Sequence, residues 1–210
     1  DANIVGAASL AVSGTANLGG SITTTGTQTY SGAVTLSAAT ITLTTTDSDV
    51  TFGGTIDSDA GQTRHLTIDT NGTTGTIQFG GLVGNTVALG AIGITGNLDL
   101  DANIVGAASL AVSGSSNLGA DVTTSGNQTY SGAVILSTNV SLSGGNQLLF
   151  GGTVNSSDTD STSDARTLTT TFTETELDGI VGGTYALGAM DINGNLDLDA
   201  NIVGAASLAV

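Results

Sequence analysis

The stretch DANIVGAASLAVSG at residues 1–14 recurs without change at 101–114, and its first twelve residues return at 199–210. Other blocks keep the same spacing: QTYSGAV at 28–34 and 128–134, FGGT at 52–55 and 150–153, and VALGA at 87–91 beside YALGA at 185–189. Self-similarity at a fixed period is the signature of a repeat architecture. We therefore divide the chain into a first repeat, 1–100, a second repeat, 101–198, and the start of a third at 199–210. These repeats are expected to form one continuous window of a longer array.

A shorter period lies inside each long repeat. Brief segments of apolar or β-branched residues recur about every ten residues, and Leu10, Tyr30 and Val50 follow one another at intervals of 20 residues. The segment Thr40–Thr44 alternates Thr with Ile or Leu, which is the period of a half-buried strand. The pattern predicts an all-β fold, a parallel β-helix (β-solenoid) with about 20 residues per rung and about five rungs per repeat, where a rung is one turn of the solenoid.

The composition favours a thin core of constant cross-section. Hydrophobic residues make up 39% of the chain but aromatic residues only 3%, so the core must be built from small aliphatic side chains. Proline, which removes a ladder donor, is absent, as is cysteine. Stacked rungs of similar sequence also allow side-chain ladders, for which we expect Asn17 and Asn117, placed at turn-like positions, to be candidates.

The charge excludes one class of partner. The formal net charge is −16, and the only cationic residues are Arg64 and Arg166, with His65 as the single histidine. Nucleic-acid binding requires Lys and Arg to neutralise phosphates, so we expect none. We also expect no membrane insertion of this segment, because no apolar run is long enough to span a bilayer. The two arginines are expected to pair with loop aspartates.

The tract GTQTYSGAVTLSAATITLTTTDSDVTFGGTIDS, residues 26–58, resembles the repeats of filamentous-haemagglutinin-like exoproteins and giant autotransporter adhesins. The resemblance is one of style, in short strands rich in Gly, Thr and Asn, and it covers most of each repeat. It implies a parallel β-helical shaft of a secreted protein that acts at the cell surface in adhesion or biofilm formation. No functional residue is carried over from that family.

The expected function is that of an extracellular structural shaft, a stiff acidic spacer in a giant repetitive bacterial adhesin or surface fibre. The alternative is a self-assembling filament of a sheath or biofilm matrix. The expected partners are neighbouring repeats or like chains in a fibre, together with a host, cell-surface or matrix ligand.

A third hypothesis is a polysaccharide-active β-helix enzyme, because glycoside hydrolysis uses paired carboxylates. Acidic pairs or clusters occur at Asp47/Asp49, at Asp57/Asp59 and at Asp158/Asp160/Asp164. Few aromatic or basic residues are available to hold a sugar, and the lone His65 without a G-x-S-x-G motif leaves no case for a catalytic triad. We therefore expect no enzyme, no catalytic residue and no cofactor.

One motif has the residue types of a cation site. GNLDLDAN occupies residues 96–103 and 194–201. Strand alternation places the amide and carboxylate residues on one face and the apolar residues on the other. The first set is Asn97, Asp99, Asp101 and Asn103, and the second is Asn195, Asp197, Asp199 and Asn201. Such oxygen ligands suit Ca²⁺. The competing interpretation, a solvated outer face with the leucines inward, is favoured, because the G-G-x-G-x-D repeat of calcium-binding β-rolls is absent.

Overall fold

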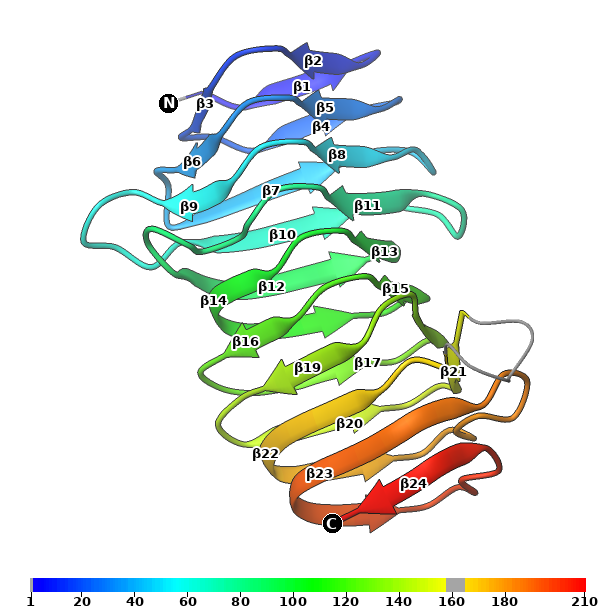
Figure 1. Ribbon diagram of the computed structural model, residues 1–210. Coiled ribbons are helices and arrows are strands. Elements are labelled where there is room, and N and C mark those ends of the chain that lie inside the picture. The colour runs from blue at the N-terminus through cyan, green and yellow to red at the C-terminus, as the bar shows by residue number, and fades with distance from the viewer. Residues whose placement is uncertain (1, 158–164) are drawn as a thin grey trace.

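The computed structural model describes residues 2–157 and 165–210, and these contain strands and no helix. The strands stack in parallel into a solenoid of about nine rungs with about 21 residues each, which confirms the fold predicted from the sequence. The N-terminal rung lies at one end of the column and the C-terminal rung at the other (Figure 1). Each rung has three sides, which we name A, B and C in the order in which the chain visits them.

Every strand pairs in parallel with the strand one rung above or below it on the same side. Side A is formed by β1 (Ile4–Ala7), β4 (Ile22–Thr24), β7 (Thr40–Thr44), β10 (His65–Asp69), β12 (Leu89–Thr95), the second half of β14 (Ile104–Val112), β17 (Gln128–Tyr130), β20 (Gln147–Phe150) and the ends of β22 (Leu168–Leu177) and β23 (Leu187–Leu198). Side B is formed by β2 (Leu10–Val12), β5 (Gln28–Tyr30), β8 (Val50–Phe52), β11 (Thr76–Phe79), β13 (Asn97–Leu100), β15 (Ser116–Leu118), β18 (Val134–Leu136) and β21 (Val154–Ser156). Side C is formed by β3 (Ala16–Leu18), β6 (Val34–Leu36), β9 (Ile56–Ser58), the start of β14, β16 (Val122–Thr124), β19 (Val140–Ser143), the starts of β22 and β23, and β24 (Ala205–Ala209).

The core is a set of columns that run along the solenoid axis. Within a strand such as β7 the exposed and buried residues alternate, and Ile41 and Leu43 are fully buried. Parallel registers place each inward residue above its counterpart in the next rung, for example Ile41 beside Leu66 and Leu43 beside Ile68. Aromatic rings follow the same rule: Tyr30 and Phe52 stack with centroids 5.1 Å apart. Each rung buries few side chains, so stability accumulates through stacking.

One long repeat covers four and two-thirds rungs. Four register steps down side A lead from Ile4 to Ile94, and two further sides bring the chain to Ile104, the counterpart of Ile4, on side C. The second repeat behaves in the same way: four steps down side C lead from Ile104 to Ile192, and two further sides lead to Ile202 on side B. The expected five rungs are thus nearly reached, but each repeat begins one side earlier than the last.

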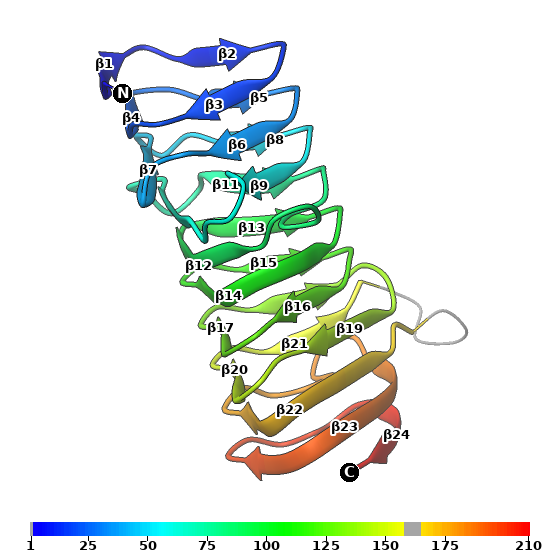
Figure 2. The same ribbon diagram turned by 90° about the vertical axis from the view of Figure 1, so that its left-hand side faces the viewer.

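Figure 2 shows the result of this rotation, because β14, β16, β19 and β22 continue the column that starts with β3, β6 and β9. The three starting motifs, at residues 2–12, 101–112 and 199–210, therefore begin on sides A, C and B in turn.

Glycine allows the rungs to approach closely at one corner. A Cβ atom built on Gly132 would lie 2.3 Å from the carbonyl oxygen of Gly114, and one on Gly32 would lie 2.4 Å from that of Gly14. Both distances are far below van der Waals contact, and the neighbouring atom is backbone that cannot move aside cheaply. The glycine corner joins sides B and C in the first repeat and sides A and B in the second, so it rotates with the sequence.

A buried polar network occurs once in each repeat. The side chain of Gln28 donates to the backbone oxygens of Ile22 and Thr44, at 3.3 and 3.0 Å, and accepts from the Tyr30 hydroxyl at 3.0 Å. Gln128 and Tyr130 repeat this arrangement, although they lie on side A and their counterparts on side B. Since an unpaired buried amide would cost about 1–3 kcal/mol, the network favours one register of the rungs.

The ladder expected of Asn17 and Asn117 takes a different form. Both residues lie in the middle of strands, β3 and β15, and not at turns. The side-chain amide of Asn117 donates to the Asp99 carboxylate in the preceding rung, at 2.9 Å, while Asn17 lies beside Thr35. Copies of one motif are four and two-thirds rungs apart, so Asn17 and Asn117 do not become neighbours. None of the described residues forms a helix that could cross a membrane.

Candidate acidic site

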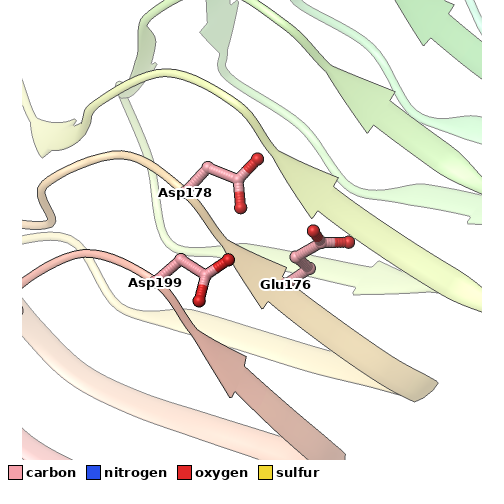
Figure 3. A group of neighbouring side chains, drawn as sticks. All are labelled: Glu176, Asp178 and Asp199. Carbon is pink, nitrogen blue, oxygen red and sulfur yellow. The ribbon is translucent and has the colours of Figure 1, made fainter.

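Three carboxylates meet at one corner near the C-terminal end of the solenoid. Glu176 lies on β22, Asp178 follows that strand, and Asp199 follows β23 one rung further on (Figure 3). Each offers an oxygen atom within 4.8 Å of the others. Stacking produces the cluster, because the backbone amide of Asp199 donates to the carbonyl of Leu177 across the two rungs at 3.1 Å.

The corner has a strongly negative potential. Partial burial raises the pKa of Glu176, and the negative charges of Asp178, Asp197, Glu174 and Asp199 raise the pKa further. The neutral amide of Gln147 donates to one oxygen of Glu174 at 3.2 Å and to one of Glu176 at 2.6 Å. No salt bridge reaches this corner from the described cations. Carboxylate oxygens so arranged have the chemistry to hold a hard cation such as Ca²⁺.

The equivalent corner of the first repeat is built differently. Gln78 takes the place of Glu176, and its side-chain amide donates to the carboxylate of Asp101 at 2.8 Å. Gly80 takes the place of Asp178. One corner therefore joins adjacent rungs by a hydrogen bond, whereas the other places carboxylates against one another.

The cation-site residues of the first repeat lie where alternation predicts. Leu98 and Leu100 point into the core, whereas Asn97 and Asp99 point outward from β13. Their oxygens already have partners: Asn97 accepts from the backbone amide of Ser115 at 3.0 Å, and Asp99 accepts from Asn117.

The remaining two residues of this row lie at the corner beyond β13. Asp101 accepts from Gln78, and Asn103 accepts from the backbone amide of Asp121 at 3.0 Å. In the first repeat the row thus serves as a set of contacts between rungs. This arrangement favours the solvated interpretation there, and calcium binding stays the less favoured, untested hypothesis.

In the second repeat all four candidates, Asn195, Asp197, Asp199 and Asn201, are exposed. Only Asp199 joins the carboxylate cluster, and its partners Glu176 and Asp178 were absent from the predicted set. The sequence does carry a signal for them, since Glu174 and Glu176 are the only glutamates in the chain. Their proximity to Asp199 follows from the stacking register, which the sequence pattern does not specify.

The other acidic pairs bind the backbone or an arginine. One oxygen of Asp57 accepts from the amides of Thr86 and Val87, at 2.7 and 3.1 Å. Asn155 takes the same role in the second repeat, so an oxygen acceptor is required there and a charge is not. Asp59 forms two hydrogen bonds with Arg64, at 2.5 and 2.9 Å, which lower the pKa of the carboxyl. A glycosidase acid would need a raised pKa.

The pair Asp47/Asp49 behaves like Asp57. Asp47 accepts from the backbone amides of Thr74 and Gly75, at 2.8 and 3.2 Å, and these bonds lower the pKa of its carboxyl. Asp49 accepts from the amide of Thr76 at 2.8 Å. The acidic cluster Asp158/Asp160/Asp164 lies outside the described residues.

The cationic residues differ between the repeats. The expected pairing with a loop aspartate is confirmed for Arg64, which binds Asp59. Arg166 has Ser157 in place of that aspartate, and its buried Nε has no hydrogen-bond partner in the described part of the chain. His65 is an exposed strand residue whose Nδ1 accepts from the amide of Ala91 at 2.9 Å.

No family model matches the chain, and comparison with curated proteins and with solved structures finds nothing detectably similar.

Proposed function

We propose that the chain is a shaft, a stiff acidic spacer in an extracellular, adhesin-like surface protein. The observation that carries the proposal is the use of one sequence on three successive sides of the rod. A catalytic or binding cleft requires a particular environment, whereas a spacer requires only that each rung accepts the next. Here the same motif begins on sides A, C and B without a change of sequence, as expected for a spacer whose function depends on its length and not on a particular site.

The contacts between rungs support a stiff rod. Strand pairing directs the ladder hydrogen bonds along the axis, and side-chain acceptors such as Asp57 and Asn103 add further bonds from one rung to the next. The net charge of −16 favours solubility and repulsion between neighbouring rods. Neither feature depends on any single site.

The experiment is to insert one further copy of residues 101–198 between Leu198 and Asp199 and to compare both proteins by small-angle X-ray scattering. A shaft is expected to lengthen by about 22 Å, from four and two-thirds rungs at about 4.8 Å each, with an unchanged cross-section. A thicker or more compact particle would refute the proposal. A flexible chain of two separate bodies would also refute it.

The self-assembling filament gives a different result in the same samples. Its particles would lengthen with protein concentration, both in scattering and in negative-stain micrographs. We expect one fixed length across the concentration series, because the acidic rods repel one another. A matched concentration series at high salt screens this repulsion. Particles that lengthen only at high salt would show that charge repulsion is what prevents contacts between rods at low salt.

A further inference from the structure

The two repeats hold their arginines in the same backbone position. The backbone amide of Arg64 donates to the hydroxyl of Ser58 at 2.9 Å, and that of Arg166 donates to the hydroxyl of Ser156 at 3.1 Å. The carbonyl of each arginine also accepts a hydrogen bond from a glycine amide in the following rung. The two guanidinium groups therefore project from equivalent places on the rod.

The partner of the guanidinium differs between the repeats. Asp59 and Ser157 occupy equivalent positions, because the backbone amide of each donates, at 2.9 Å, to the leucine carbonyl that ends the preceding strand on the same side. Asp59 binds Arg64 through two hydrogen bonds, the paired geometry in which a carboxylate matches a guanidinium. Ser157 has no carboxylate, and the buried Nε of Arg166 finds no hydrogen-bond partner in the part of the chain that the structure describes.

This unpaired donor indicates a missing anion. Arginine does not lose its proton in proteins, and a buried charged donor without an acceptor is both costly and rare. The charge of the corner favours an anion as well. Asn155 and Ser157 stand where the first repeat has Asp57 and Asp59, so the second corner has two negative charges fewer at these positions while it keeps its arginine.

We propose that Arg166 is a binding site for a carboxylate, which takes the place that Asp59 has beside Arg64. A soluble carboxylated ligand, such as an acidic sugar, and a further aspartate of this chain would supply the same pair of oxygens. Arg166 as a whole is only half-buried, so its corner is open to solvent. The inference does not rest on the shaft function, because the length of the rod is the same whether this site is filled or empty.

Nuclear magnetic resonance of the ¹⁵N-labelled full chain tests the site, because two arginines give two Nε–Hε signals, which Arg166→Lys assigns. Sodium acetate is titrated and compared with sodium chloride of the same ionic strength. The Arg166 signal is expected to shift in a saturable way with acetate alone. The Arg64 signal is expected to stay in place, because Asp59 already occupies its guanidinium. In Ser157→Asp, which copies Asp59, the Arg166 shift should be lost.

A second variant distinguishes the two sources of the carboxylate. It replaces Asp158, Asp160 and Asp164, the aspartates between Ser157 and Arg166 in the sequence, by asparagine. A shift already present in the parent supports a site for a soluble ligand, and a shift that appears only in the triple variant supports a site filled by an aspartate of the chain. No acetate-specific shift in either protein, or a shift that persists when Ser157→Asp is added, would overturn the inference.

Discussion

Replacing Gly132 by alanine tests how closely the rungs stack at the glycine corner. The new methyl carbon would lie 2.3 Å from the carbonyl oxygen of Gly114 and 2.5 Å from its carbonyl carbon, whereas ordinary contact begins near 3.4 Å. The rungs must therefore separate by roughly 1 Å at this corner, and overpacking of this kind costs about 1–3 kcal/mol. Reduced freedom of the unfolded chain offsets about 0.4–1 kcal/mol of that cost. We expect a net loss of about 1–2 kcal/mol in the free energy of unfolding.

Gly93 is the matched control. It lies in the middle of β12, and no atom is within 4 Å of the position that its Cβ would take. Gly93→Ala is expected to stabilise the protein by about 0.5–1 kcal/mol, because a strand glycine costs about that much relative to alanine. For a chain of this length, 1 kcal/mol corresponds to about 2–4 °C in Tm.

The two variants are compared by thermal and urea unfolding followed by circular dichroism. Hydrogen exchange then locates the weakened rungs, because solenoids can unfold in parts. A Gly132→Ala protein as stable as the parent, or a Gly93→Ala protein that is less stable than Gly132→Ala, would refute the close stacking at this corner.

Three further predictions concern the acidic residues. Glu176→Gln is expected to raise Tm and Gln78→Glu to lower it. Because the folded-state pKa of Glu176 is raised, its proton stabilises the fold at low pH, and that contribution is lost as pH rises through the pKa. The gain in Tm from Glu176→Gln should therefore be largest at neutral pH and vanish in acid. An equal gain at all pH values would contradict this cause. Asp57→Ala is expected to cost about 1 kcal/mol in unfolding experiments by leaving two backbone amides without their acceptor, whereas Asp57→Asn, which copies Asn155, should be nearly neutral; equal effects of the two substitutions would exclude that role. Finally, the less favoured calcium hypothesis requires that Ca²⁺ at about 100 times its Kd stabilises the protein by about 2.7 kcal/mol, and an identical Tm in Ca²⁺ and in chelator would reject it.

The comparison of sequence and structure is clearest where the same pattern has two outcomes. Alternation within GNLDLDAN predicted correctly that Leu98 and Leu100 would be buried and that Asn97 and Asp99 would point outward. It gave no information on what lies in the neighbouring rung. That neighbour is Gln78 in the first repeat and Glu176 in the second, and the difference separates a hydrogen-bonded corner from a cluster of carboxylates.

The amino-acid sequence by itself determined the repeat, the strand-forming segments, the inward residues and a rung of about 20 residues. These are local properties, set by alternation, glycine content and side-chain size. Only the tertiary structure decided how the rungs align. Stacked positions are separated by 18 residues between Ile4 and Ile22 but by 26 between Ile68 and Ile94, because loops of unequal length leave the column at different corners. The numbers of residues in the successive rungs together give four and two-thirds rungs per repeat. This fraction determines the side of the solenoid that each copy of the sequence faces.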